Sequence, residues 1–540
     1  MNGSSRDGGE GQDATRPSPR AVRLLLLGAI ALGIAARAVI HFGTPLEPRI
    51  NGPYYLVQVR SMLESGHLAV PDLPLIFWMQ AAVAQAIQFF TSFEQERAIV
   101  LACKLVDSIA PVLLVLPAYF LLGRWRNKNL AFVAVAAVLS LAVVHPPLLA
   151  MTSEFEKNAL GLVWFAALGI GVRETLVGPS PRAATVVLFF LMLTGLTHIG
   201  VFGAALLFGT LAFIGGLAFL PARRKWLLGL CAMSICVVAF VLLVMWRWFD
   251  PQRGERLLNA LLPGKHLVVD EKPAQRAGMA PQPQASSNAG PRRNPPVMPL
   301  LIMFILPVVL IHVKAIGALL VVWRQRRPLP PGECVFIAAT AVTALVLAWP
   351  FVISDRAVRL QMIAVGPLVL LTPFVLTHWH GRRVRLAVAT AIFVITMGSL
   401  WFSLGWNMKP TIPEDSYEEL RSLRTSIADP SRTLIIAPHG LEWWVVWTLR
   451  TKFAHSHAVR ADDWQKYAMV AVLKQKRGGG PPAWGRRPLS ARNQDNAAVQ
   501  RGGTQQSFDE FSIPADAQIL ADGTTFALMR LVHPPANLPR

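Results

Sequence analysis

Long apolar runs separated by short polar segments recur along the first 405 residues of the chain. A helix needs roughly 17–25 mostly apolar residues to cross about 30 Å of hydrocarbon, and by that measure the sequence predicts about eleven spanning helices. These are residues 24–42, 98–122, 129–148, 157–172, 184–199, 201–220, 226–247, 298–322, 333–352, 359–378 and 384–404. The fold class expected is therefore an α-helical polytopic membrane protein.

One further run, Pro74 to Phe90, is ambiguous, because its periodicity does not say whether it crosses the membrane. The distribution of Arg and Lys favours a run that does not cross, since only then do most basic clusters fall on the side of the N-terminus. The clusters are Arg20 and Arg23, Arg124 to Lys128, Arg173 and Arg182, Arg223 to Lys225, Arg324 to Arg327, and Arg382 to Arg385. The positive-inside rule then predicts a cytoplasmic N-terminus, an exterior loop over residues 43–97 and an exterior C-terminus.

The exterior loop 43–97 is expected to form two helices at the membrane surface. In "YYLVQVRSMLES" the apolar residues Tyr55, Leu56, Val59, Met62 and Leu63 fall on one face of a helix. An amphipathic helix of this kind lies in the plane of the membrane interface. With the run from Pro74 to Phe90 it would form a lid over the outer end of the bundle.

Composition agrees with a membrane protein: 53% of the residues are hydrophobic and the mean hydropathy is +0.43. The net charge of +21 sits mostly in short loops between apolar runs, so it indicates topology and not nucleic-acid binding. The four cysteines show no metal-ligand or disulfide spacing. Residues 24–42 are interpreted as an uncleaved first span, with a cleaved signal peptide as the alternative.

Outside the spans, the sequence predicts a polar cytoplasmic tail over residues 1–20 and a transmembrane domain over 21–405 that includes a long exterior loop at 249–297. Residues 406–540 are expected to form a small exterior α/β domain with a disordered insert at 475–507. The segments "TLIIAP" and "AQILADGTTFALMRLV" are typical of strands, the second folded back at an Asp-Gly turn. The segment "HGLEWWVVWTL" is typical of a helix whose tryptophans either pack or stack on a sugar.

Three segments carry a family resemblance: "NGPYYLVQVRSMLESGHLAVPDLPLIFWMQAA", "ERAIVLACKLVDSIAPVLLVLPAYFLLGRWR" and "VISDRAVRLQMIAVGPLVLL". They resemble the GT-C superfamily of membrane glycosyltransferases, which includes protein O-mannosyltransferases and the aminoarabinose–lipid A transferase. The resemblance covers most of residues 20–405. It implies a polyprenyl-phosphate-linked sugar as donor and an exterior lipid, glycan or protein as acceptor.

The chain departs from the family pattern at one position. Where the family has an acid at the start of the first lid helix, this sequence has Asn51. An amide cannot take a proton from a hydroxyl or anchor a metal as a carboxylate does. The catalytic carboxylate is therefore sought among Glu47, Asp72, Glu154 and Glu156.

Further residues are expected to bind substrate, each with a structural alternative. They are Asn51, Tyr54, Tyr55, Lys104, Asp107, Lys157, His198 and Arg356. Lys104 and Asp107 are spaced i, i+3 inside a span, where they either pair with each other or line a polar cavity. Glu154 and Glu156 either face the lid or favour the start of the next helix, and His198 either binds substrate or packs. Arg356 either holds a donor phosphate or pairs with Asp355.

The function predicted is transfer of a sugar to an exterior acceptor by an integral protein of the bacterial inner membrane. A GT-C-like binding or assembly protein that has lost its acid is the first alternative, and a transporter of lipid-linked glycans is the second. No metal-ligand cluster is visible in the sequence, so the cofactor stays open, with a divalent cation as one candidate. Partners expected are the bilayer, the donor and the acceptor, and no nucleic acid.

Overall fold

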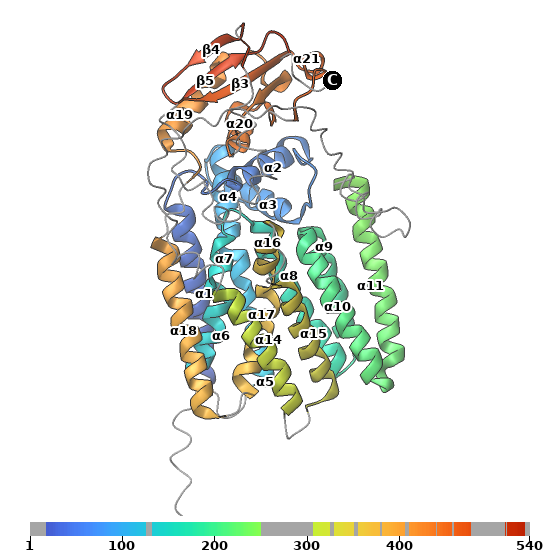
Figure 1. Ribbon diagram of the computed structural model, residues 1–540. Coiled ribbons are helices and arrows are strands. Elements are labelled where there is room, and N and C mark those ends of the chain that lie inside the picture. Colours follow the sequence, from blue (N-terminus) through green and yellow to red (C-terminus); the bar gives the residue numbers. More distant parts are fainter. Residues whose placement is uncertain are drawn as a thin grey trace, which may run out of the picture.

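The computed structural model describes residues 18–125, 132–249, 306–324, 329–349, 355–378, 381–405, 410–438, 440–455, 458–476, 513–514 and 516–534. A bundle of long helices carries a smaller domain with a β-sheet at one end, and two helices lie between them (Figure 1). Residues 1–17 of the predicted tail 1–20, and nearly all of the predicted loop 249–297 and insert 475–507, lie outside the described residues.

The bundle is built from apolar helices. They are α1 (Pro19–Phe42), α4 (Gln95–Ile109) continued by η2 (Ala110–Leu114) and α5 (Val115–Trp125), α6 (Phe132–Val144), α7 (Pro146–Ala150), α8 (Glu156–Val177), α9 (Pro181–Thr197), α10 (Ile199–Phe219), η3 (Pro221–Arg223), α11 (Arg224–Val244), η4 (Met245–Phe249), α14 (Leu306–Arg324), α15 (Pro331–Leu347), α16 (Asp355–Ile363), α17 (Val365–His378) and α18 (Arg382–Gly405). Within the described ranges, eight helical segments are long and apolar enough to cross a membrane. The other three predicted spans correspond to α9, α14 and α15, whose apolar stretches are shorter, so the count of eleven stays a prediction.

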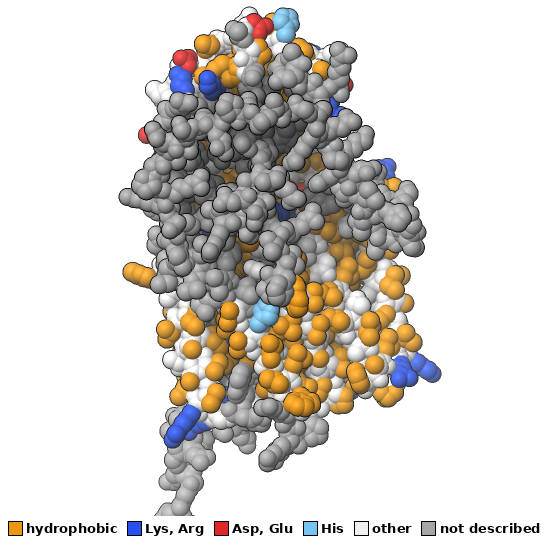
Figure 2. All heavy atoms as spheres, in the orientation of Figure 1, with side chains coloured by type: hydrophobic (Ala, Val, Ile, Leu, Met, Phe, Trp, Pro, Cys, Tyr) orange, Lys and Arg blue, Asp and Glu red, His pale blue; other side chains and the backbone are white. Residues whose placement is uncertain are grey.

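The outside of the bundle is hydrophobic. Trp401 is 82% exposed, Phe219 70% and Ile235 68%. Figure 2 shows hydrophobic side chains covering the described bundle surface in view, with Lys and Arg near its lower edge. Such a surface is stable against lipid and not against water. Together with the apolar helices, it makes the chain an integral membrane protein.

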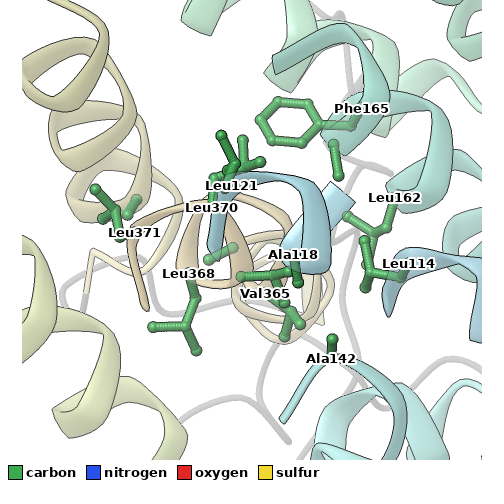
Figure 3. Close-up of a cluster of buried hydrophobic side chains, with 14 of the residues drawn as sticks. Leu114, Ala118, Leu121, Ala142, Leu162, Phe165, Val365, Leu368, Leu370 and Leu371 are labelled. Atoms are coloured by element: carbon green, nitrogen blue, oxygen red, sulfur yellow. The ribbon is translucent and has the colours of Figure 1, made fainter. Parts of the chain in front are cut away.

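The inside of the bundle is close-packed around the span formed by α4, η2 and α5. Figure 3 shows side chains of η2 and α5 meeting those of α6, α8 and α17. A Cβ on Gly169 of α8 would lie 2.6 Å from Leu370 Cδ1, so a larger residue there would require the Leu370 side chain of α17 to shift. The 3-10 turn η2 contains Pro111, which lacks an N–H and cannot continue the regular α-helical ladder. The change from α-helix to 3-10 helix therefore comes at Ala110, shortly after Asp107 on the polar face of α4.

Between the bundle and the sheet lie α2 (Gly52–Ser65) and α3 (Leu75–Phe90), where Figure 1 shows both near one end of the bundle. Both helices were predicted from the sequence. Gly66, with φ +74, ends α2 in the left-handed conformation that glycine adopts without steric cost. The α3 helix packs on α4 and α2, which places it above the spans.

The C-terminal domain is a small α/β unit, as predicted. Its strands are β1 (Thr433–Ile436), β2 (Lys452–Ala454), β3 (Met469–Gln475), β4 (Gln518–Asp522) and β5 (Phe526–Arg530), in the order β2-β1-β3-β5-β4. The first three strands are parallel to one another, and β3-β5-β4 are antiparallel. Its helical segments are α19 (Glu414–Ser422), η6 (Leu423–Ser426), η7 (Pro430–Arg432), α20 (Glu442–Leu449) and α21 (Asp463–Lys466). The predicted Asp-Gly turn is present, and Glu419 of α19 accepts hydrogen bonds from the N–H groups of Thr525 and Phe526 beside it.

Candidate functional site

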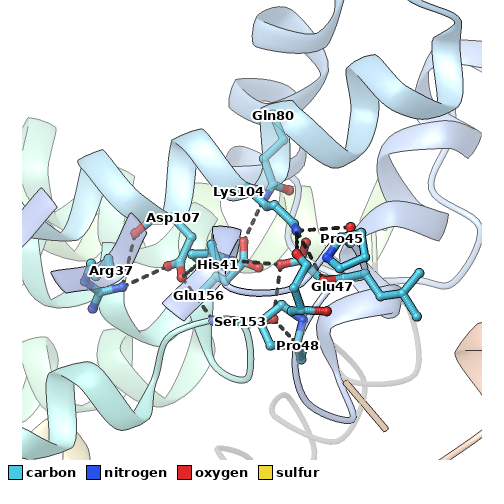
Figure 4. A network of polar contacts seen from close by, with 12 residues as sticks. Arg37, His41, Pro45, Glu47, Pro48, Gln80, Lys104, Asp107, Ser153 and Glu156 are labelled. Carbon is cyan, nitrogen blue, oxygen red and sulfur yellow. Dashed lines mark hydrogen bonds and ion pairs between the residues drawn. The ribbon is translucent and has the colours of Figure 1, made fainter. Parts of the chain in front are cut away.

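A cluster of buried polar side chains lies where the bundle meets the α2–α3 layer (Figure 4). Its centre is Asp107 of α4. Arg37 of α1 donates to Asp107 Oδ1 at 3.2 Å and to the Leu148 carbonyl at 2.7 Å. His41, one turn further along α1, has its Nε2 2.8 Å from Asp107 Oδ2. These side chains are at most 1% exposed, so the charges of Arg37 and Asp107 stabilise each other away from water.

His41 continues the cluster to the loop after α1. Its Nδ1 lies 3.1 Å from Glu47 Oε1. Ser153, in the loop between α7 and α8, donates its hydroxyl to Glu47 Oε1 at 3.1 Å or to the Pro48 carbonyl at 2.6 Å. The Ser153 N–H donates to Asp107 at 3.0 Å. The loops 43–51 and 151–155 are thereby fixed to each other and to α4.

Two backbone features show how tightly these loops are held. Ser153 has φ +62, a left-handed conformation that is unfavourable for a residue with a Cβ. A Cβ on Gly52 would lie 2.5 Å from Glu47 Cγ and 2.8 Å from Ser153 Oγ. Glycine at position 52 therefore allows the start of α2 to lie directly against both loops.

Lys104 and Asp107 do not pair with each other, which was one of the two alternatives for their i, i+3 spacing. Lys104 Nζ donates to the carbonyls of Thr44, Pro45 and Leu46 at 2.7, 3.2 and 3.2 Å. Asp107 instead turns toward α1, where Arg37 offers a charged donor. The i, i+3 spacing permits a pair, but each side chain has its partners on another segment.

Glu156, in the first turn of α8, is fully buried. Its Oε2 accepts a hydrogen bond from Gln80 Nε2 of α3 at 2.6 Å, whereas Oε1 has no hydrogen-bond partner in the described part of the chain. The lid helix α3 is thus tied to the bundle through this carboxyl group.

The outer part of the cluster contains Asn51, the position of the missing acid. Asn51 Nδ2 donates to Glu154 Oε1 at 2.7 Å, and the Asn51 N–H donates to Glu154 Oε2 at 3.3 Å. Both residues are half-buried. A carboxylate from the loop before α8 therefore lies beside Asn51.

Next to this pair, Asp72 is held between two donors. It accepts short hydrogen bonds from Tyr54 of α2 and from Lys157 of α8. Gln58 donates to the Tyr54 hydroxyl at 2.9 Å and to the Val70 carbonyl at 2.8 Å. Burial by itself raises the pKa of Asp72. The Lys157 ammonium and the hydrogen bonds that Asp72 accepts outweigh this effect, so its pKa lies below the ordinary value.

The lowered pKa of Asp72 gives a pH-dependent contribution to stability. Stabilisation by Asp72 is complete above its unfolded-state pKa, about 3.9, and is lost as the pH falls through the lower folded-state pKa. We expect the difference in Tm between wild type and Asp72→Asn to be constant from pH 7 to 5 and to close below about pH 4. Thermal unfolding of both proteins across this range checks it. A difference that already closes near pH 6 would contradict the assignment.

Arg49 lies just before Asn51 and also has left-handed backbone, with φ +64. Burial lowers the pKa of its guanidinium below the ordinary value, and the nearby carboxylates of Glu154 and Asp107 oppose that shift. A residue held in this conformation needs contacts on both sides to keep it there. No sequence pattern indicated that Arg49 belongs to the site.

Aromatic rings surround the Lys157 ammonium. It lies 5.2 Å from the centre of the Tyr54 ring and 5.7 Å from that of Phe77. Tyr55 is buried, which raises the pKa of its hydroxyl well above the ordinary value, and that hydroxyl lies 3.5 Å from the Lys157 N–H. The Tyr54 ring meets Trp443 of the C-terminal domain edge to face, with 4.7 Å between centres.

The structure therefore gathers Glu47, Asn51, Tyr54, Tyr55, Asp72, Lys104, Asp107, Glu154, Glu156 and Lys157 at one end of the bundle. His198 lies between α9 and α10, where its Nδ1 accepts the Val201 N–H at 3.3 Å as a helix cap. The side chains of Asp355 and Arg356 lie outside the described residues. Arg359, three positions later in α16, is exposed, with its guanidinium 5.3 Å from the centre of the Phe155 ring.

Sequence patterns did not indicate the roles of His41, Arg49 or Gln80. His41 is the single histidine of an apolar span, and Gln80 is one amide in an apolar run, so neither has a diagnostic spacing. Among the described residues, no group of three His, Cys, Asp or Glu side chains is placed to hold a metal ion. The cofactor accordingly stays a prediction from the sequence.

Comparison with known proteins returns solved structures only. No protein-family model matches the sequence, and no curated protein matches it. The chain is similar to ArnT from Cupriavidus metallidurans bound to undecaprenyl phosphate, with 13% identity, a TM-score of 0.48, and coverage of 94% of this chain and 99% of that one. It is similar to the Archaeoglobus fulgidus oligosaccharyltransferase in complex with Zn and sulfate, with 12% identity, a TM-score of 0.49, and coverage of 82% and 67%.

A third similar structure is the arabinofuranosyltransferase AftD from Mycobacteria, with 12% identity, a TM-score of 0.49, and coverage of 96% of this chain and 40% of that one. All three are GT-C glycosyltransferases, the superfamily that the sequence resembles. The likeness concerns the overall arrangement of the chain alone.

Proposed function

We propose that this protein is a membrane glycosyltransferase that moves a sugar from a polyprenyl-phosphate donor to an exterior acceptor. The observation that carries the proposal is the Asn51–Glu154 pair. It puts a half-buried carboxylate at the start of the lid helix α2, where the family pattern expects an acid. A carboxylate in that position can accept the proton of an acceptor hydroxyl.

Glu154 suits this role better than the other carboxylates. The Glu47 side chain is fully buried and is bound by His41 and Ser153. Glu156 is equally buried, and Asp72 is neutralised by Lys157. Only Glu154 combines partial exposure with an anchor, Asn51, that donates to it and leaves acceptor capacity on both oxygens.

The reaction would be a substitution at the anomeric carbon of the donor sugar. The acceptor oxygen forms a bond to this carbon while its proton passes to Glu154. The bond from the anomeric carbon to the phosphate oxygen breaks, and the electron pair leaves with the polyprenyl phosphate. Negative charge on that leaving group needs fixed cations nearby.

Three cations are close enough to the Glu154 loop to serve the phosphate. Arg49 lies in the loop before α2, the same loop in which Asn51 binds Glu154, and Lys157 lies in the first turn of α8, directly after the Glu154 loop. Arg359 stacks on Phe155, the residue next to Glu154. Arginine is well suited to a phosphate because it can engage two oxygens at once. Arg356 stays a candidate by sequence.

The proposal predicts that binding of the lipid carrier requires its phosphate. We expect the purified protein in nanodiscs to bind undecaprenyl phosphate at least about 10-fold more tightly than undecaprenol, the size of effect given by a charge-assisted contact. Competition binding or native mass spectrometry measures both lipids. Incubation with undecaprenyl-phosphate-linked pentoses and hexoses then tests for release of undecaprenyl phosphate.

Equal binding of the two lipids would count against a phosphate site. Specific binding without release from any donor would favour the alternative of a GT-C-like binding protein. The amide at position 51 was the reason to consider that alternative, and the carboxylate of Glu154 beside it supports the transferase instead.

A further inference from the structure

The C-terminal domain shares a hydrophobic core with the lid helices. Tyr55, Leu56 and Val59 of α2 and Ile76 and Phe77 of α3 belong to the same cluster of buried side chains as the interior of that domain. The members from the domain include Ile412, Leu420, Leu441, Trp444, Trp447 and Leu528. Most of the bundle interior belongs to a separate cluster. The domain and the lid are therefore packed as one unit, with α4 reaching into it.

Two arginines connect α2 with the C-terminal domain, one from each side of the contact. Arg60 of α2 donates to the Trp447 and Val446 carbonyls at the end of α20, at 2.6 and 2.7 Å, and lies 4.8 Å from the centre of the Trp447 ring. Arg450, directly after α20, binds back to Glu64 of α2 at 3.3 Å and Glu96 of α4 at 3.0 Å. Burial lowers the pKa of Arg60 to about 10, so it remains charged at neutral pH.

The same domain also reaches the candidate site itself. Arg49 and Pro410 form a parallel β-bridge, and the Thr411 hydroxyl donates to the Arg49 carbonyl at 3.0 Å. Pro410 and Thr411 belong to the segment that leads from α18 into the C-terminal domain. This segment therefore holds Arg49, and two residues later in the same loop Asn51 binds Glu154.

We infer that the C-terminal domain sets the geometry of the candidate site, with Thr411 as a positioning residue that acts through the backbone of Arg49. This inference rests on the proposed function for its consequence in binding, but its structural content does not depend on any ligand. Left-handed backbone at a residue with a Cβ persists only where its surroundings impose it. The hydrogen bond from Thr411 is a described contact that imposes it from outside the bundle.

When Thr411 is lost as a donor, the Arg49 loop should relax and carry Asn51 away from Glu154. The test is Thr411→Val, which keeps the side-chain shape and removes the hydroxyl. Thr411→Ser restores the donor and serves as the rescue. The matched control is Thr425→Val in the same domain, where the hydroxyl donates to the Ser422 carbonyl at 2.9 Å, away from the site.

Two measurements are made on the full-length protein in nanodiscs. Hydrogen–deuterium exchange of the peptide over residues 43–54 reports the loop without any ligand. Binding of undecaprenyl phosphate reports the site. We expect Thr411→Val to speed exchange in residues 47–52 and to weaken binding by about 5-fold or more, the effect of losing one partly buried hydrogen bond. Thr411→Ser and Thr425→Val should match wild type.

The outcomes separate this inference from the proposed function. Unchanged exchange in Thr411→Val overturns the inference, whatever the binding result. Failure of the wild-type protein to prefer undecaprenyl phosphate over undecaprenol is a failure of the proposed function, and exchange alone then decides the inference.

If Thr411→Val does not fold, Arg60→Lys, which cannot reach both α20 carbonyls in the same way, is expected to speed exchange in the same loop. Its failure to do so would overturn the inference too.

Discussion

Glu154→Gln is expected to reduce sugar transfer by at least about 100-fold, because a positioned general base contributes roughly 10²- to 10⁴-fold to such reactions. The glutamine keeps the size of the side chain and one oxygen that accepts from Asn51, but it cannot take up the proton of an acceptor hydroxyl. Binding of undecaprenyl phosphate should persist, since the substitution leaves unchanged the cations proposed to hold its phosphate, Arg49, Lys157 and Arg359. Transfer from the donor identified in the release assay measures the effect.

Glu94→Gln is the matched control for this prediction. Glu94 is an exposed acid at the start of α4 and makes no side-chain capping bond. Its substitution should leave transfer at the wild-type rate. If Glu154→Gln transfers sugar as well as Glu94→Gln does, the base lies elsewhere and Asp72 becomes the next carboxylate to test. If both are inactive, the assay reports stability and not chemistry.

The helices of this protein could be predicted from its sequence because their cause is local. Apolar length identified the positions of the long helices in the bundle, and the apolar face of "YYLVQVRSMLES" identified α2. The strand pair at Asp522 and Gly523 followed from turn chemistry. The number of true spans did not follow, because α9, α14 and α15 are short enough for length alone to be ambiguous.

The partners within the site could not be predicted, because they are long-range. Asn51 and Glu154 are 103 positions apart, and nothing near Asn51 in the sequence shows that a carboxylate lies next to it. The sequence therefore suggested a site without an acid at position 51, whereas the fold places Glu154 of another loop beside Asn51. Lys104 shows the same limit: its spacing from Asp107 favoured a local pair, but three carbonyls of the loop after α1 bind it instead.

The buried part of the cluster has a different task from its outer part. Glu47, Asp107 and His41 bind one another and Ser153, and their side chains are sealed from solvent. Such groups cannot exchange protons readily with an acceptor. What they do is fix the loops that carry Asn51 and Glu154, so their loss should appear in stability before it appears in chemistry.

Asp107→Asn tests whether the buried part of the cluster serves stability, and it should have the largest effect on stability. The amide keeps the shape of the side chain but leaves the Arg37 guanidinium, 1% exposed, without its counter-charge. Removing one partner of a buried ion pair costs about 3–5 kcal/mol, because the other charge stays buried and uncompensated. Unfolding of the protein in detergent micelles, followed by heat or by added denaturant, measures the loss.

Asp522→Asn provides the comparison, since the same substitution there breaks an ion pair with Lys476 in which the two side chains are 55% and 35% exposed. Exposed pairs contribute at most about 1 kcal/mol, because water screens them and both side chains lose freedom. A loss at Asp107 no larger than the loss at Asp522 would show that Arg37 finds another partner, such as the carbonyls of Asp107 and Leu148 that it already contacts. The cluster would then hold the loops through hydrogen bonds to the backbone, and the charge on Asp107 would be free for another role in the site.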